Sequence, residues 1–210
     1  MLYDITRPLT SHTAVFPGDP PVVITQVMQI AQGDACNVSS ISMSAHAGTH
    51  IDAPRHYSND GIGVDRLPLE ALIGPARVIT LEALDAVSLA DVQRLGDVCG
   101  LAVLVHTRAS DTPHDVFDPR FTYFSAQAAE WLGQQGARMI GTDAPSVDAA
   151  TSADLPVHHI FLRHNVIIME NLFLRDVPDG DYMLIALPLK IADCDAAPAR
   201  VILLQEEIED

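Results

Sequence analysis

Short runs of β-branched and other apolar residues recur along the whole 210-residue chain, and they restrict its fold more strongly than any other feature. Each run is rich in Val and Ile and is bounded by Gly, Pro or Asp, which is typical of strands. The runs cover residues 22–30, 38–46, 76–81, 101–107, 137–143, 165–172, 182–189 and 199–205.

Two helices are indicated between these strands, and each begins at a serine that can cap it and ends at a glycine. They cover residues 88–96 and 125–136, and weaker helical patterns cover 68–74 and 156–165. The second helix separates two strands, as in a strand–helix–strand unit, whereas the first half of the chain holds few helices. We therefore expect an α/β fold with a mixed sheet flanked by helices, not a doubly wound parallel sheet.

Size and composition suit one domain over residues 1–210, or one domain with an arm used in oligomerisation. Apolar residues make up 48% of the chain, which is enough for a sizeable core. The net charge of −16 argues against nucleic acid and anionic membranes as partners, because both need a basic surface. No apolar stretch of about 18 residues occurs, so we expect no transmembrane helix.

The cysteines indicate a reducing compartment. Cys36, Cys99 and Cys194 are odd in number, widely spaced and without a CxxC motif, which is typical of free thiols in a cytoplasmic protein. The first residues also lack a basic start followed by an apolar run, so we expect no signal peptide.

Residues 46–56, HAGTHIDAPRH, concentrate four side chains that can bind a metal or transfer a proton. All four stand at even positions, so an extended backbone would present them on one face. Gly48 and Pro54 oppose a helix and leave the row of donors unobstructed. We therefore expect an edge-like or bulged strand that presents His46, His50, Asp52 and His56.

Imidazole and carboxylate groups are ligands of zinc, and a set without cysteine is also compatible with Mn²⁺ or Fe²⁺. Further donors lie at His158, His159, His164 and Glu170. Glu170 ends an apolar run, where a buried carboxylate needs a partner or a metal. One of the adjacent pair His158 and His159 is expected to point inward, and the spacing does not distinguish them.

The remaining histidines, His12, His106 and His114, have no neighbours of this kind and are interpreted as ordinary.

These motifs resemble those of the metal-dependent cyclase-like hydrolases, a family that includes the bacterial kynurenine formamidases. HAGTHIDAPRH matches the family pattern HxGTHxDxPxH. The segments FPGDPP (16–21), MIGTDAPSVD (139–148), HHIFLRHNVIIMENL (158–172) and the stretch 176–203 are similar to other blocks of the family. The likeness covers nearly the whole chain, and it implies an α/β fold around a central, partly barrel-like sheet, usually in homodimers.

The resemblance also implies a site with two divalent metal ions, with zinc as the expected metal and manganese as the alternative. In the family pattern, His46 and His50 bind the first ion and Asp52 bridges both. His158, rather than His159, binds the second ion, and Glu170 bridges from the far side. His56 is then the general acid/base and not a ligand.

The implied activity is hydrolysis of N-formyl-L-kynurenine, an aryl formamide, to L-kynurenine and formate. Phe16 stands where the formamidases usually have tryptophan, and the resemblance places it on the wall of the substrate pocket. The alternatives are an isatin hydrolase or another cyclic-amide hydrolase of the family, and a metal-dependent binding protein without catalysis. Metals with a purely structural role fit poorly, because such zinc sites tend to be rich in cysteine.

Overall fold

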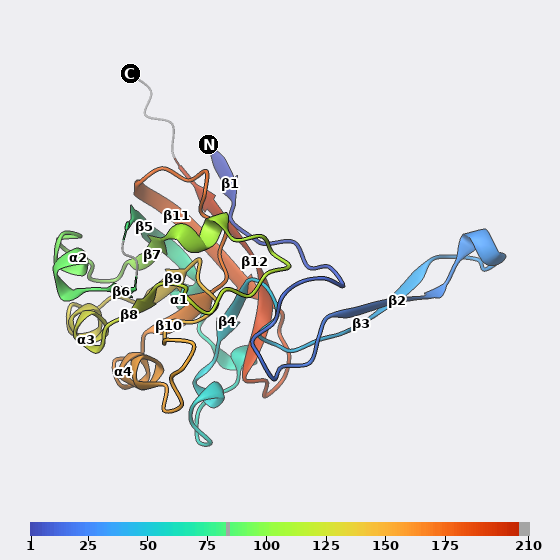
Figure 1. The fold of residues 1–210 in the computed structure, drawn as a ribbon, viewed down its shortest axis with the longest axis horizontal. Helices are drawn as coiled ribbons and strands as arrows, with labels where there is room; N and C mark the ends of the chain where they lie inside the picture. The colour runs from blue at the N-terminus through green and yellow to red at the C-terminus, as the bar shows by residue number, and fades with distance from the viewer. Residues whose placement is uncertain (83–84, 206–210) are drawn as a thin grey trace.

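The computed structural model describes residues 1–82 and 85–205, and a mixed β-sheet forms its centre (Figure 1). The strands of this sheet are β1 (Leu2–Asp4), β4 (His50–Asp52), β5 (Ile73–Thr80), β7 (Ala102–His106), β9 (Met139–Thr142), β10 (Ile167–Glu170), β11 (Gly180–Pro188) and β12 (Ala196–Leu204).

The sheet closes into a barrel. Its order is β1-β12-β11-β5-β7-β9-β10-β4, and β12 also pairs with β4, so that every strand except β1 belongs to the closed ring. β5, β7, β9 and β10 pair in parallel, whereas the pairings of β4, β11 and β12 with their neighbours are antiparallel. The expected mixed, partly barrel-like sheet is therefore confirmed.

The helices are α1 (Leu69–Leu72), α2 (Leu89–Gln93), α3 (Ala126–Gln134) and α4 (Pro156–Arg163), each within or overlapping a predicted helical range. Ser88 and Ser125 cap α2 and α3, since their side chains accept hydrogen bonds from backbone N–H groups of the first turn. Short 3₁₀ helices cover Ile30–Gln32, Pro54–His56, Val64–Arg66 and Arg108–Asp111. No helix within residues 1–82 and 85–205 has the length and apolar character that crossing a bilayer requires.

Two apolar clusters lie on opposite sides of the sheet. Inside the barrel, Ile51, Leu104 and Met169 belong to one cluster. On the outer face, Ile140 and Ile168 pack with residues of α2, α3 and α4, which cover this side of the sheet (Figure 1). Successive residues of a strand point to opposite faces. The neighbours of the inward-facing residues Ile51 and Met169 therefore point to the outer face.

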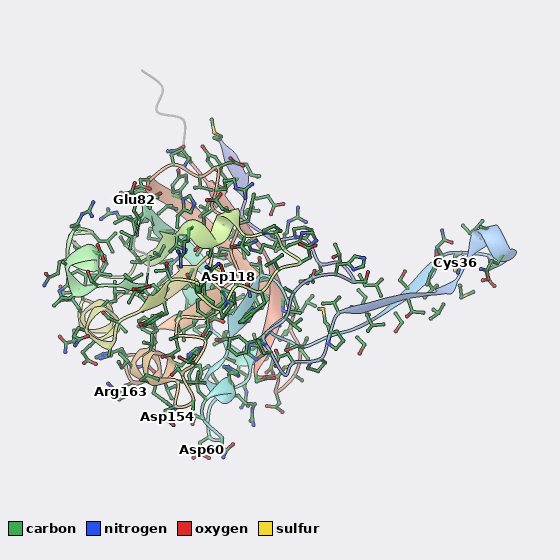
Figure 2. The ribbon with its side chains drawn as sticks, viewed as in Figure 1. Cys36, Asp60, Glu82, Asp118, Asp154 and Arg163 are labelled. Carbon is green, nitrogen blue, oxygen red and sulfur yellow. The ribbon has the colours of Figure 1, made fainter. Side chains whose placement is uncertain are left out.

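A hairpin arm extends away from the barrel (Figure 1). It consists of β2 (Val23–Met28) and β3 (Val38–Ser42), which pair only with each other, and Cys36 lies near its far end (Figure 2). Every residue of both strands is exposed. The strands predicted over 22–30 and 38–46 thus exist in shortened form, but they build an arm and not part of the central sheet.

The continuous strand predicted over residues 46–56 is wrong. Only His50–Asp52 are in strand conformation, whereas residues 45–49 form turns and bends. Gly48 adopts a left-handed φ of 66°, and Pro54 begins a 3₁₀ helix that ends at His56. Three very short strands were not predicted: β1, and the isolated parallel pair β6 (Ala86–Val87) and β8 (Tyr123–Phe124).

Candidate active site

Neighbouring strands bring three acidic and imidazole side chains together on the outer face of the barrel. β4 and β10 are antiparallel, and their register places Glu170 opposite His50 and Ile168 opposite Asp52. Directly opposite residues of such a pair have Cβ atoms about 4.5–5.5 Å apart. His50 Nε2 lies 3.3 Å from Asp52 Oδ1 and 3.4 Å from Glu170 Oε2, and all three residues are buried.

Two further histidines reach the same point from outside the strand. The turn at Gly48 directs His46 back toward the strand, so that His46 Nδ1 lies 3.0 Å from Asp52 Oδ1. A side chain at Gly48 would strain the left-handed backbone and bring its Cβ within 2.7 Å of Leu9. His56 follows from the 3₁₀ helix, with its ring 4.1 Å from that of His46.

His158 completes the group from helix α4. Its Nε2 lies 3.5 Å from Asp52 Oδ2 and 3.5 Å from Glu170 Oε1. His158 is only 2% exposed, whereas the adjacent His159 is exposed. The structure therefore resolves which of the two histidines points inward.

The donor set fits a divalent metal. Ligand atoms of two overlapping groups, His46–Asp52–His56 and His50–Asp52–Glu170, lie within 4.8 Å of one another. His50 Nε2 and both carboxylate oxygens of Asp52 are buried, and none of them has a hydrogen-bond partner of normal geometry among the described residues. Burying a carboxylate without such partners is costly, and a bound cation would remove that cost.

The charges of the group are strongly interdependent. Burial opposes a charge on His50, but the neighbouring carboxylates of Asp52 and Glu170 outweigh it and raise its pKa to about 10. Burial likewise opposes ionisation of Asp52, but the adjacent imidazoles of His158 and His46 hold its pKa well below the ordinary value. In the absence of metal, protons on the imidazoles therefore balance the carboxylates.

His56 differs from the other histidines of the group. Its side chain is 28% exposed, more than that of His46, His50 or His158. Burial lowers its pKa below the ordinary value, and the carboxylate of Asp52 only partly opposes this effect. The ring is therefore neutral near pH 7 and can accept a proton.

Backbone and carboxylate groups contact the histidines and Glu170 from behind and fix the direction of their side chains. His50 Nδ1 lies 2.9 Å from the carbonyl oxygen of Gly48, and the backbone N–H of Val147 donates to Glu170 Oε1 at 2.9 Å. His46 Nε2 lies 2.9 Å from Asp195, and His158 Nδ1 lies 2.7 Å from Asp148. These contacts leave His50 Nε2 and His158 Nε2 directed at the centre of the group.

A cavity of about 930 Å³ opens above the histidines. His46, His50, His56 and His158 form part of its lining, and Phe16 and Phe117 form an aromatic wall with ring centroids 5.3 Å apart. Phe16 also packs against a small apolar cluster that contains Phe121. The structure thus places Phe16 beside the cavity that contains the candidate metal ligands.

Several residues of the site gave no signal in the sequence analysis. His114, interpreted as ordinary, lines the same cavity, with its Nε2 3.4 Å from Thr10 Oγ1. Asp148 and Asp195 contact the histidines and lie within the family blocks 139–148 and 176–203, but they stand in loops, where no periodicity reveals the direction of a side chain. Their membership of these blocks was the signal that could have drawn attention to them.

Known proteins with similar sequences identify the family of this chain. The model of the Cyclase family matches residues 3–149. A kynurenine formamidase of Bordetella avium is 43% identical over 205 residues, which cover 96% of this chain and 97% of that protein.

Solved structures agree as well. One, described as a potential metal-dependent hydrolase with cyclase activity, has a TM-score of 0.87 and 34% identity, covering 99% of this chain and 98% of its own. An isatin hydrolase bound to a product analogue has a TM-score of 0.86, covering 98% of this chain and 92% of its own, and at 22% identity it shows the shared fold alone. On these matches, the chain belongs to the Cyclase family of metal-dependent hydrolases, with kynurenine formamidases among its relatives.

Proposed function

We propose that this protein is a kynurenine formamidase, which hydrolyses N-formyl-L-kynurenine to L-kynurenine and formate. The observation that carries the proposal is the convergence of His46, His50, Asp52, His158 and Glu170 beneath an aromatic-walled cavity. The 43% identity to the Bordetella avium enzyme over nearly the full length supports this substrate.

The proposed cofactor is a pair of divalent ions, with zinc preferred and manganese as the alternative. His46 and His50 would hold the first ion and His158 the second, while Asp52 and Glu170 would bridge them. The central position of Asp52, within 3.5 Å of all three histidines, supports its bridging role. Such ions polarise a carbonyl and lower the pKa of water toward neutrality.

His56 is the proposed general acid/base. Its ring is neutral near pH 7, lies on the cavity wall and is the most exposed imidazole of the group. It would take the proton that the attacking water loses and pass it to the departing aryl amine nitrogen. That nitrogen is a poor leaving group unless it is protonated, so this transfer governs cleavage of the C–N bond.

Phe16 would hold the aryl ring of the substrate. Its place on the cavity wall, edge-on to Phe117, supports this role, and the offset or edge-to-face contact that it can make is typical of aromatic pairs. Phenylalanine in place of the formamidases' usual tryptophan retains the aromatic wall but lacks an indole N–H donor.

The proposed function is tested by comparing kcat/KM for N-formyl-L-kynurenine and for isatin, with formate release as the first readout. A formamidase should prefer the formyl substrate, whereas an isatin hydrolase should show the opposite order. A protein that binds either compound but turns over neither would instead be a metal-dependent binding protein.

We further propose that the enzyme is a homodimer in which the partner covers the arm. An isolated two-stranded hairpin is marginally stable in water, yet this arm exposes Ile24 and Ile41 as a directly opposed pair. Wild-type protein should sediment as a dimer, and the double substitution Ile24→Asp and Ile41→Asp should shift it toward a monomer.

A cytoplasmic location is proposed because Cys36, Cys99 and Cys194 are free thiols.

A further inference from the structure

Asp148 contacts His158 through both its backbone and its ring. Asp148 Oδ2 accepts a hydrogen bond from the backbone N–H of His158 at 3.1 Å and lies 2.7 Å from the ring atom Nδ1. Its other oxygen, Oδ1, accepts from the backbone N–H of Val157 at 3.0 Å. Asp148 is only 2% exposed, so solvent does not compete with these contacts.

The two backbone contacts make Asp148 the cap of helix α4. The residue before this helix, Leu155, has a left-handed φ of 43° and offers no capping side chain, and Pro156 occupies the first turn. Free N–H groups of a first helical turn need an acceptor, which is usually supplied by the preceding residue. Here the acceptor comes from a loop after β9, so Asp148 fixes the start of α4 relative to the sheet.

The ring contact fixes the tautomer of His158. An ionised carboxylate can only accept hydrogen bonds, so the proton of a neutral ring must lie on Nδ1. The lone pair is then on Nε2, the atom directed at Asp52 and Glu170 from 3.5 Å. A carboxylate behind a histidine ligand both orients the ring and raises its basicity.

We propose that Asp148 is a positioning residue for the metal centre, which sets the tautomer and direction of His158 so that its Nε2 binds the second ion. This inference rests on the proposed ligand role of His158. The support of the other histidines is different: His50 Nδ1 faces a backbone carbonyl, and His46 contacts Asp195, whose side chain is 45% exposed. Loss of the Asp148 carboxylate should therefore affect one of the two ions selectively.

Asp143 provides a matched control. It is a carboxylate of the same 139–148 segment, 1% exposed, and it accepts four hydrogen bonds from Thr107 and Ser110. No described hydrogen bond or ion pair joins it to a histidine ring. Asp143→Asn and Asp148→Asn thus make the same chemical change at equally buried sites, but only the second removes a carboxylate from an imidazole.

The experiment titrates chelator-stripped protein with zinc in competition with a chromophoric chelator. Asp148→Asn should weaken binding of one ion by about 10–100-fold and leave the other unchanged, as expected for loss of a carboxylate behind a ligand. Asp143→Asn should bind both ions with wild-type affinity. In a His158→Ala background, Asp148→Asn should cause no further loss, because its effect passes through His158.

A ¹⁵N NMR spectrum of histidine-labelled wild-type protein loaded with zinc provides a readout that needs no variant to fold. His158 should carry its proton on Nδ1 and bind through Nε2. A proton on Nε2, undiminished zinc affinity in folded Asp148→Asn, or an equal loss in Asp143→Asn would overturn the inference. A wild-type chain that binds no zinc would overturn the proposed metal centre itself.

Discussion

Asparagine in place of Asp52 should abolish stabilisation of the protein by zinc. The substitution keeps the size of the side chain but removes its charge and one of its two acceptor oxygens. Asp52 lies within 3.5 Å of His46, His50 and His158, and neither of its buried oxygens has a hydrogen-bond partner of normal geometry among the described residues. Both proposed ions therefore depend on this one carboxylate.

The expected size of the effect follows from mass action. Zinc at 1,000 times its dissociation constant stabilises a one-site protein by about 4.1 kcal/mol. A protein of this length changes its Tm by roughly 2–4 °C for each kcal/mol. Zinc should thus raise the Tm of chelator-stripped wild-type protein by about 8–16 °C, and a second ion adds to this shift.

Differential scanning calorimetry of stripped protein, with and without zinc, measures the shift directly. Asp52→Asn should retain a cooperative transition but show almost no response to zinc. His159→Ala is the control, because this exposed histidine is adjacent to His158 but belongs to neither group of candidate metal ligands. A full zinc-dependent shift in Asp52→Asn would refute the reasoning that Asp52 bridges the ions.

Three further predictions concern the proton-transfer group, the aromatic wall and the imidazole protons. His56→Ala should keep the metals but lose about 10²–10⁴-fold in kcat, and loss of an ion on elemental analysis would make His56 a ligand. Phe16→Ala should raise KM for N-formyl-L-kynurenine several-fold at unchanged metal content, while Phe16→Trp is tolerated. Lower thermal stability of Phe16→Ala with unchanged kinetics would make Phe16 a core residue. Because neighbouring carboxylates raise the pKa of His50 to about 10, zinc must displace its proton at pH 7. Zinc affinity should therefore rise with pH below 10, and calorimetry in buffers of different ionisation enthalpy should detect proton release; a pH-independent affinity would contradict this.

The sequence was sufficient to predict the mixed sheet and most of its strands, because Val- and Ile-rich runs bounded by Gly and Pro report strands locally. These local patterns did not reveal the barrel closure, which only the family resemblance implied and which depends on β12 pairing with β4 on one side and β11 on the other. Nor did they show that β2 and β3 leave the sheet, since a strand in an arm has the same local pattern as a strand in a core.

The structure brings the predicted site residues close to one another, but the extended backbone predicted for residues 46–56 was partly wrong. Alternation holds for His50 and Asp52, which share a face of β4 opposite to Ile51. His46 and His56 reach the site through a glycine turn and a 3₁₀ helix instead. The register that sets Glu170 opposite His50 is a long-range pairing, which no local pattern encodes.

We propose above all that this chain is a formamidase whose activity requires two metal ions held by one cluster of histidines and carboxylates. The most direct test titrates chelator-stripped protein with zinc while formate release from N-formyl-L-kynurenine is measured. We predict negligible activity in stripped protein and a rise that ends at two equivalents of zinc per chain. Full activity in the stripped protein, or no formate release at any zinc concentration, would contradict the account.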